Sequence, residues 1–371
     1  MKTPEYDLAG IARNFRIPGD FISAEPYGSG HINDTFASIF DQDGTAVRYI
    51  HQRINHQVFK QPALVMENIE RVLNHLHAKL KAAGSADIHR RAMTLVSARD
   101  GKAWFVDHAG NTWRTYVFIE KATTYDVVAS TSMAHATARS FGEFQGLLAD
   151  LPGGRLHETI PGFHDTPKRF MALEEAIRTD AVRQARQARP EIEFALARKA
   201  MTNRLIQAFE DGRIPERITH NDTKLNNVMI DNATGQGVCV IDLDTVMPGL
   251  ALYDFGDMAR TATRSSGEDE QDLSKVLFKD EMFEALVRGY LESAGHFLNP
   301  QEIDFLAFSA SLITFEIGIR FLTDHLSGNT YFKIHRPDQN LDRCRVQFKM
   351  VQEMEARREV MEAAVRRYAR S

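Results

Sequence analysis

The fold of this chain is decided by residues 220–244, which read HNDTKLNNVMIDNATGQGVCVIDLD. A polar loop leads through a short strand and a turn into a second strand, residues 237–241, which is wholly apolar. Asp222, Asn227 and Asp242 each lie at the end of one of these hydrophobic runs. Carboxylate and amide oxygens placed in this way can hold Mg²⁺ and a nucleotide phosphate beside an acceptor hydroxyl.

The loop that opens this stretch has the register His-x-Asp-x-Lys-x-x-Asn, which is the layout of the protein-kinase catalytic loop. In that layout the Asp orients the acceptor hydroxyl and receives its proton, while the Asn and the Asp at the end of the next strand hold metal ions. The spacing therefore predicts that Asp222 is catalytic and that Asn227 and Asp242 are metal ligands. A polar turn before a buried strand is the structural alternative.

A second carboxylate, Asp254, opens a literal Asp-Phe-Gly tripeptide further along the chain. No apolar strand leads into it, whereas residues 237–241 place Asp242 at a strand end. We therefore assign the metal to Asp242. We expect Asp254 to cap the helix that begins near Phe255 and to tie that helix to the catalytic loop.

Three further polar residues of the stretch have less specific roles. Lys224, two positions after Asp222, can reach a transferring phosphoryl group and offset its charge, although a solvent-facing loop lysine would look the same. His220 is expected to be buried and to shape the loop. Asp244 either contacts the metal or ligand or caps the following turn, and the sequence does not separate these roles.

The segments HNDTKLNN, VIDLD and YDFGDMAR together resemble the aminoglycoside phosphotransferase and choline kinase superfamily, whose core pattern is HxDxxxxN followed by a strand-terminal Asp. Three other stretches are similar to the N-acetylhexosamine 1-kinase group. They are YGSGHINDTF at residues 27–36, YIHQRINHQVF at residues 49–59 and IPGFHDTPKRF at residues 160–170. The matching segments follow kinase order along most of the chain.

The resemblance implies an α+β, bilobal protein-kinase-like fold. Residues 1–120 would form a small nucleotide-binding lobe with an antiparallel sheet and a helix, and residues 121–371 a larger, mainly helical catalytic and substrate-binding lobe. It also implies ATP as phosphoryl donor, Mg²⁺ as cofactor and the anomeric hydroxyl of an N-acetylhexosamine as acceptor. A kinase of another small alcohol (choline, aminoglycoside or homoserine type) and a catalytically silent nucleotide-binding homologue stay open as alternatives.

A glycine-rich segment precedes the predicted hairpin formed by residues 37–40 and 46–54. Glycines let backbone N–H groups approach phosphates without interference from Cβ atoms. A hairpin turn that needs positive φ would also explain them. The position upstream of the catalytic loop favours nucleotide contacts from Gly28, Ser29, Gly30, His31 and Asn33.

The third strand of such a sheet should supply a cation to the phosphates, and protein kinases use Lys there. This chain has Arg53, as choline-kinase-like members do, although an exposed strand-end arginine is nearly as good an account. The predicted helix over residues 63–81 carries Glu67, either an ion-pair partner of Arg53 or a solvated surface residue. The strand over residues 113–119 ends at Glu120, where a hinge would bind adenine.

Two residues near the end of the chain match sugar-contacting positions of the N-acetylhexosamine 1-kinase group. They are Arg320 and Tyr331 in the segment GIRFLTDHLSGNTYFKI. An arginine without a partner is costly to bury, so Arg320 is expected to face a cleft or a carboxylate. Structural pairing explains Arg320 almost equally well.

Other segments predict the remaining elements. We expect a hairpin between residues 93–98 and 103–107. Helices are expected over residues 130–148, 166–186, 191–210, 273–293, 301–326 and 341–368, the last with fewer than four clean heptads and so packed on its own lobe.

Bulk composition excludes several classes of protein. With 43% apolar and 26% charged residues the chain is an ordinary globular protein, and its net charge of −5 argues against nucleic-acid binding. Two cysteines make neither a disulfide framework nor a zinc site. Charged residues interrupt the apolar stretch 303–322, which predicts a buried helix and not a membrane span. The first residues, MKTPEYDLAG, lack a secretory signal. We therefore expect a cytoplasmic monomer that binds ATP and a sugar.

Overall fold

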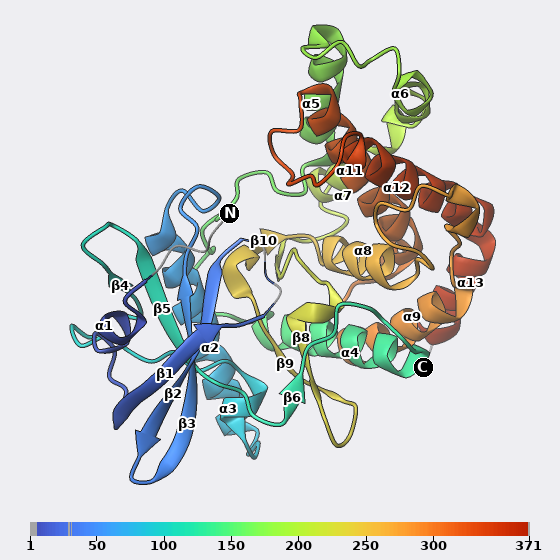
Figure 1. The fold of residues 1–371 in the computed structure, drawn as a ribbon. Helices are drawn as coiled ribbons and strands as arrows, with labels where there is room; N and C mark the ends of the chain where they lie inside the picture. Colours follow the sequence, from blue (N-terminus) through green and yellow to red (C-terminus); the bar gives the residue numbers. More distant parts are fainter. Residues whose placement is uncertain (1–5, 29, 31, 370–371) are drawn as a thin grey trace.

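The computed structural model describes residues 6–28, 30 and 32–369. Its N-terminal part is an antiparallel five-stranded sheet in the order β1-β2-β3-β5-β4 (Figure 1). The strands are β1 (Asp20–Pro26), β2 (Asp34–Gln42), β3 (Thr45–Arg53), β4 (Phe105–Val106) and β5 (Thr112–Val117). The β2–β3 hairpin is confirmed. Its turn residues Asp43 and Gly44 have φ of 53° and 85°, the conformation that tight hairpins require.

Helix α2 (Pro62–Ala82) joins the sheet to the rest of the molecule. The buried residues on α2 include Val65, Ile69 and Leu73, and they share one apolar cluster with Phe141 and Val228 from the C-terminal part. The helix predicted over residues 63–81 is therefore confirmed. A short helix α1 (Leu8–Ala12) packs at the outer face of the sheet, and α3 (Ile88–Arg91) follows α2.

The C-terminal part is mainly helical, with two small sheets at the place where it meets the N-terminal sheet (Figure 1). These sheets are β6-β8-β9 (Ala122–Thr123, Val228–Asp231, Gly237–Val240) and β7-β10 (Arg217–Thr219, Met247–Gly249). The helices are α4 (Thr131–Leu148), α5 (Thr166–Thr179), α6 (Arg189–Leu196), α7 (Arg204–Glu210), α8 (Ala251–Ala262), α9 (Asp280–Ala294), α10 (Pro300–Asp304), α11 (Leu306–Leu326), α12 (Gln339–Ala356) and α13 (Arg358–Tyr368).

Helix α11 is the predicted buried apolar helix. Among the described residues it is the one helix that is long and apolar enough, by length and composition, to cross a membrane, and 72% of its most apolar window is buried inside the protein. Leu312, Ile313 and Phe315 are almost fully buried. Figure 1 shows α11 beside α12 and among the other helices, so it is a core helix of this fold.

Several sequence expectations about the elements are wrong. Residues 93–98 form no strand of the predicted hairpin; Leu95 makes an isolated antiparallel bridge to Tyr116 of β5, and β4 also pairs with β5. The helix expected over residues 166–186 ends at Thr179, where Asp180 adopts the left-handed conformation. The helices expected over residues 191–210, 301–326 and 341–368 are each broken, the second at Phe305 between α10 and α11 and the third at Arg357 between α12 and α13. The helix expected over residues 273–293 begins only at Asp280.

Candidate active site

The predicted catalytic loop, residues 220–227, is held in place by a buried carboxylate on α8. Asp254 accepts hydrogen bonds from the backbone N–H groups of His220 (2.9 Å) and Asn221 (2.7 Å), and from the side-chain amide of Gln145 (2.6 Å). Asn221 has φ of 64°, a left-handed conformation that Asn tolerates better than most residues. Asp254 does tie the loop to α8 as predicted. It does not cap the helix, since α8 begins three residues earlier at Ala251.

His220 is a buried residue that shapes the loop, as predicted. Its Nε2 donates to the Ile241 carbonyl (2.8 Å), and its Nδ1 accepts from the backbone N–H of Asp222 (3.3 Å). The rings of Phe141 and Phe144 pack edge-on against the imidazole. These contacts set the position of Asp222 relative to the strand end at Ile241.

Asp222 lies in direct contact with two of the residues predicted to act with it. Lys224 Nζ is 3.0 Å from Asp222 Oδ1, and the Asn227 side-chain amide donates to Asp222 Oδ2 (3.1 Å) and to its backbone carbonyl (2.7 Å). Partial enclosure opposes the charge on Lys224, but the negative charge of Asp222 outweighs it and raises the pKa of Lys224. The structure thus brings together a carboxylate, a cation and an amide.

The start of β8, next to Asn227, and the end of β9, next to Asp242, lie side by side. Val228 pairs with Val240, and Ile241 N–H donates to the Asn227 carbonyl (2.9 Å), so Asn227, just before β8, lies at the same end of the ladder as Asp242, just after β9. Asp242 has φ of 60° and a side chain open to solvent. Protein atoms enclose the Asp242 carboxylate on its other sides. This burial and the charges of nearby carboxylates raise the pKa of Asp242 to about 6.

These groups fit a divalent cation by the chemistry of their oxygens. The Asn227 amide uses its nitrogen for Asp222, which leaves the amide oxygen for a metal. The crowding of carboxylate charge around Asp242 is the condition that a bound cation relieves. Mg²⁺ is bound in many phosphotransfer sites by one or two protein oxygens, with phosphates and waters completing the shell.

Asp244 is not available to a metal or ligand. It is almost fully buried, is paired with Arg114 of β5 and accepts a hydrogen bond from the Asn33 side chain (2.6 Å). Arg114 also donates to Gln52 of β3 (2.9 Å). Sequence reasoning missed Arg114, although a charged residue inside the run WRTYVFI was a signal that a buried partner exists.

The glycine-rich segment leads into β2 as predicted. Gly28 has φ of 80°. A Cβ atom built at Gly28 or Gly30 would have no neighbouring heavy atom of the described residues within 4 Å. Ser29 and His31 lie outside the described residues. Asn33 connects the end of this segment to the catalytic half through Asp244, and its side-chain oxygen accepts from Asn55 N–H (3.0 Å).

The predicted ion pair between Arg53 and Glu67 is wrong. Arg53 Nε lies 2.6 Å from Asp34 on the neighbouring strand, because positions 34 and 53 are paired in the β2–β3 ladder. Glu67 is half exposed, and its carboxylate lies 3.0 Å from Nε2 of His157. A nucleotide contact by either residue stays a prediction.

Glu120 follows the end of β5, where a hinge was predicted. Its carboxylate accepts two hydrogen bonds from the Arg48 guanidinium, one of them from Nε (2.9 Å). These bonds lower the pKa of Glu120. Its backbone carbonyl accepts from Arg90 Nε (3.1 Å). The Arg48 guanidinium also lies over the ring of Phe118, 3.7 Å from its centroid, so an aromatic and a paired cation line this segment.

Arg320 and Tyr331 lie close together, as the predicted acceptor site requires. The Arg320 guanidinium is 6.0 Å from the centroid of Tyr331, 5.7 Å from that of Phe332 and 5.4 Å from that of Phe163. His164, next to Phe163 in sequence, contacts the catalytic loop, because its Nε2 is 3.3 Å from the Asn221 carbonyl. This cluster of aromatic rings therefore adjoins the loop that carries Asp222.

A protein-family model and several solved structures match this chain. A model of the phosphotransferase enzyme family (APH) matches residues 23–298. Among solved structures, an aminoglycoside phosphotransferase from Alicyclobacillus acidocaldarius is similar with a TM-score of 0.61 at 13% identity, covering 100% of this chain and 98% of the other. A choline kinase from Cryptosporidium parvum has a TM-score of 0.57 at 15% identity (98% and 99% covered). A microcompartment-associated aminopropanol kinase has a TM-score of 0.57 at 17% identity (95% and 97% covered).

The chain belongs to the phosphotransferase enzyme family, since the family model covers most of its length. By family it is therefore a phosphotransferase, and the solved structures confirm the α+β, protein-kinase-like architecture predicted from the sequence.

Proposed function

We propose that this phosphotransferase moves the γ-phosphoryl group of ATP, with Mg²⁺, to the anomeric C1 hydroxyl of N-acetylglucosamine or N-acetylgalactosamine, and releases the sugar 1-phosphate. The observation that carries the chemistry is the direct contact of Asp222 with Lys224 and Asn227 beside the solvent-open Asp242. Phosphoryl transfer needs positioning and charge neutralisation more than covalent catalysis, and these groups supply both.

Each residue has one task in this proposal. Asp222 orients the acceptor hydroxyl and receives its proton; an anomeric hydroxyl is more acidic than other sugar hydroxyls, so a carboxylate is a sufficient base. Lys224 offsets charge on the transferring group. Asn227 and Asp242 hold Mg²⁺, which when bound neutralises the phosphate oxygens.

The acceptor assignment is supported by the three stretches similar to N-acetylhexosamine 1-kinases and by the proximity of Arg320 to Tyr331. The competing acceptor choline would need an aromatic cage for its quaternary ammonium group. Three aromatic rings do meet near the catalytic loop, but they already surround the guanidinium of Arg320. This occupation favours a neutral acceptor that the guanidinium can hydrogen-bond.

The test is an ATP-consumption assay on the purified protein with a panel of acceptors: both N-acetylhexosamines, glucose, choline, an aminoglycoside and homoserine. Phosphorus NMR of the product then identifies the phosphorylated position. We expect turnover with an N-acetylhexosamine and a C1 phosphate. Preferred turnover of choline or an aminoglycoside would overturn the acceptor, and no turnover of any acceptor would favour a silent homologue.

We further propose a cytoplasmic monomer. Cys239 and Cys344 are both free and buried, which suits a reducing compartment. Light scattering on the purified protein at several concentrations tests the monomer, and a mass that doubles with concentration would contradict it.

A further inference from the structure

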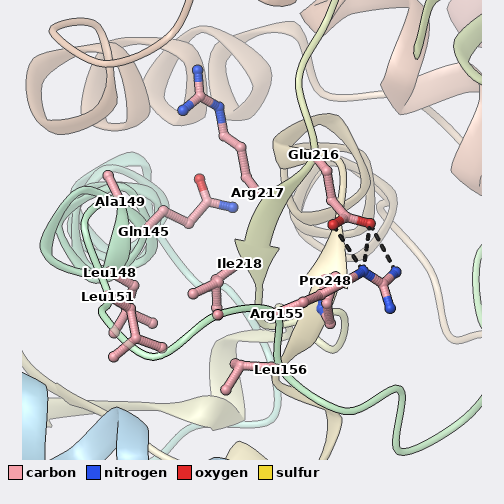
Figure 2. A pocket seen from close by; sticks show the side chains of 11 residues that line it. Gln145, Leu148, Ala149, Leu151, Arg155, Leu156, Glu216, Arg217, Ile218 and Pro248 are labelled. Carbon is pink, nitrogen blue, oxygen red and sulfur yellow. Dashed lines mark hydrogen bonds and ion pairs between the residues drawn. The ribbon is translucent and has the colours of Figure 1, made fainter. Parts of the chain in front are cut away.

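A solvent-open cavity of about 300 Å³ lies next to Gln145, a side chain that supports the loop of residues 220–227 (Figure 2). It lies between the end of α4, residues 151–156, β7 and β10. Small-molecule pockets in proteins occupy roughly 300–1,000 Å³, so the cavity is at the lower end of that range. None of the residues assigned above to the donor or acceptor lines it.

Apolar side chains form one wall of the cavity, and the charged side chains in the rest of its lining are already paired with opposite charges. Its apolar lining residues are Leu148, Leu151, Leu156, Ile218 and Pro248. Figure 2 shows Arg155 at its edge, with the guanidinium bonded to the carboxylate of Glu216. Arg155 also contacts the carboxylate of Glu158 (2.8 Å), so two anions share this cation. The other cationic lining residue, Arg217, is paired with Glu302 (2.6 Å), so an anionic ligand is disfavoured there.

One polar side chain of the lining leads directly to the catalytic loop. Gln145 donates from Nε2 to Asp254 (2.6 Å), and its Oε1 accepts from the Tyr290 hydroxyl (2.5 Å). A glutamine amide has two N–H groups and two oxygen lone pairs, so these two bonds use half of its capacity. The remaining N–H group and oxygen lone pair of Gln145 can hydrogen-bond to an amide or hydroxyl group of a ligand.

The geometry points to a regulatory site for a neutral small molecule with a compact apolar body and one amide or hydroxyl group. The apolar body lies on the leucines and Ile218, and the polar group pairs with Gln145. Because Asp254 holds the backbone N–H groups of His220 and Asn221, a change at Gln145 reaches the loop that carries Asp222.

The binding test uses benzamide as the neutral probe and benzoate, of the same shape, as the charged control. Titration calorimetry on the full chain should show saturable one-to-one binding of benzamide. Benzoate should bind at least about tenfold more weakly, because a carboxylate would enter a site without a free cation. Absence of saturable binding, or equal affinity for benzoate, would overturn the site.

A matched pair of variants locates the probe. Ala149 lines the cavity and Ala83 does not, yet both are exposed residues at the C-terminal end of a helix. Ala149→Trp should weaken benzamide binding at least about tenfold by filling the cavity, whereas Ala83→Trp should leave it unchanged. Equal affinity of the two variants would contradict the assignment. If Ala149→Trp does not fold, the Ile218 methyl resonance of the wild type provides the same test, since it must shift with benzamide and not with benzoate.

Coupling to the catalytic loop has its own readout, which does not depend on any phosphotransfer activity. Saturation with benzamide should shift the backbone amide resonances of His220 and Asn221, whose N–H groups donate to Asp254. Resonances of the distant turn residues Asp43 and Gly44 serve as the unperturbed reference. Saturable binding without a shift at His220 and Asn221 would refute the regulatory role.

Discussion

At Asp222, the two oxygens of a single carboxylate are divided between a cation and an amide. Lys224 is on Oδ1 and Asn227 on Oδ2, and both donors come from the same short loop. The loop therefore builds its own electrostatic setting before any substrate arrives. What remains for the acceptor hydroxyl is one lone pair on each oxygen, which restricts the directions from which it can approach.

Replacement of the two carboxylates tests their roles. Asp222→Asn should lower kcat by about 10²–10⁴-fold, the usual contribution of a general base, with little change in ATP affinity. Asp242→Asn should lose both activity and the dependence on Mg²⁺ concentration. Steady-state kinetics and nucleotide titration measure these effects, with exposed Asp100→Asn as the control. Near-wild-type turnover of either variant would refute the assignment.

His51 gives the fold a pH-dependent stability that is separate from catalysis. Its ring lies between Ser38 Oγ (2.7 Å) and Thr115 Oγ1 (2.8 Å) inside the sheet, and burial lowers its pKa to about 4 from 6.5. Between these values the unfolded chain binds a proton that the folded chain does not. Stability is therefore full above about pH 6.5 and is lost as pH falls toward 4, by about 3 kcal/mol.

Unfolding measured from pH 7 to pH 4 checks this prediction. His51→Gln should be less stable at pH 7 but should lose less stability on acidification than the wild type. His56→Gln, at an exposed position five residues further along the chain, should follow the wild-type profile. Parallel profiles for wild type and His51→Gln would show that His51 does not titrate in this way.

At the scale of elements, α8 positions the catalytic loop from one face and packs on α11 with the other. Asp254 faces the loop, while a Cβ atom at Gly256 would lie 2.6 Å from the Ser309 carbonyl and 2.6 Å from Ile313 Cγ1. The Asp-Phe-Gly tripeptide is thus a structural element of α8: its Asp holds the loop and its Gly allows close helix packing.

Gly256→Ala should destabilise the protein. Alanine gains up to about 1 kcal/mol of helix propensity, but overpacking against a backbone oxygen costs about 1–3 kcal/mol and should prevail. Thermal unfolding measures the difference. Gly267→Ala is the control, because the nearest atom to its Cβ would be 3.9 Å away. Equal melting temperatures would mean that α8 and α11 can separate at little cost.

The buried pair of Arg114 and Asp244 joins β5 to the segment that follows β9. Arg114→Met leaves a carboxylate buried without its cation, which should cost about 3–5 kcal/mol. Adding Asp244→Asn should restore part of that loss, since the neutral amide can keep its contact with Asn33. Chemical denaturation of the single and double variants measures the coupling, and additive losses would show that the two side chains act independently.

At the scale of the whole molecule, the sheet and the helical part meet around Asp244. Asn33 and Arg114 come from the N-terminal part, and Asp244 comes from the segment that follows β9. We propose that residues 1–120 and 121–371 act as two lobes that a nucleotide holds together. A ligand that contacts both lobes should stabilise both.

A non-hydrolysable ATP analogue with Mg²⁺ should raise the unfolding free energy by about 2.7 kcal/mol at one hundred times its dissociation constant. Hydrogen exchange should then slow both in the segment that precedes β2 and in the catalytic loop. Protection confined to residues 1–120 would contradict a nucleotide site shared between the two lobes.

Local sequence patterns were enough to predict the strand ends and the first turn around the site. The register of residues 220–227 and the apolar strand before Asp242 predict which side chains lie at strand ends, and the Asp43-Gly44 turn predicts the first hairpin. These features depend on backbone periodicity and turn chemistry within a few residues. The failed hairpin at residues 93–98 shows the limit, because strand pairing was decided by the competing run at β5.

The tertiary structure alone decided the partners of the charged side chains. Arg53 pairs with Asp34 and not with Glu67, Arg114 reaches Asp244 across 130 positions, and Gln145 reaches Asp254 across 109. A buried charge takes the partner that packing brings near it, and packing is set by the whole core, which no local pattern encodes. The cavity beside Gln145 likewise exists only where α4, β7 and β10 meet.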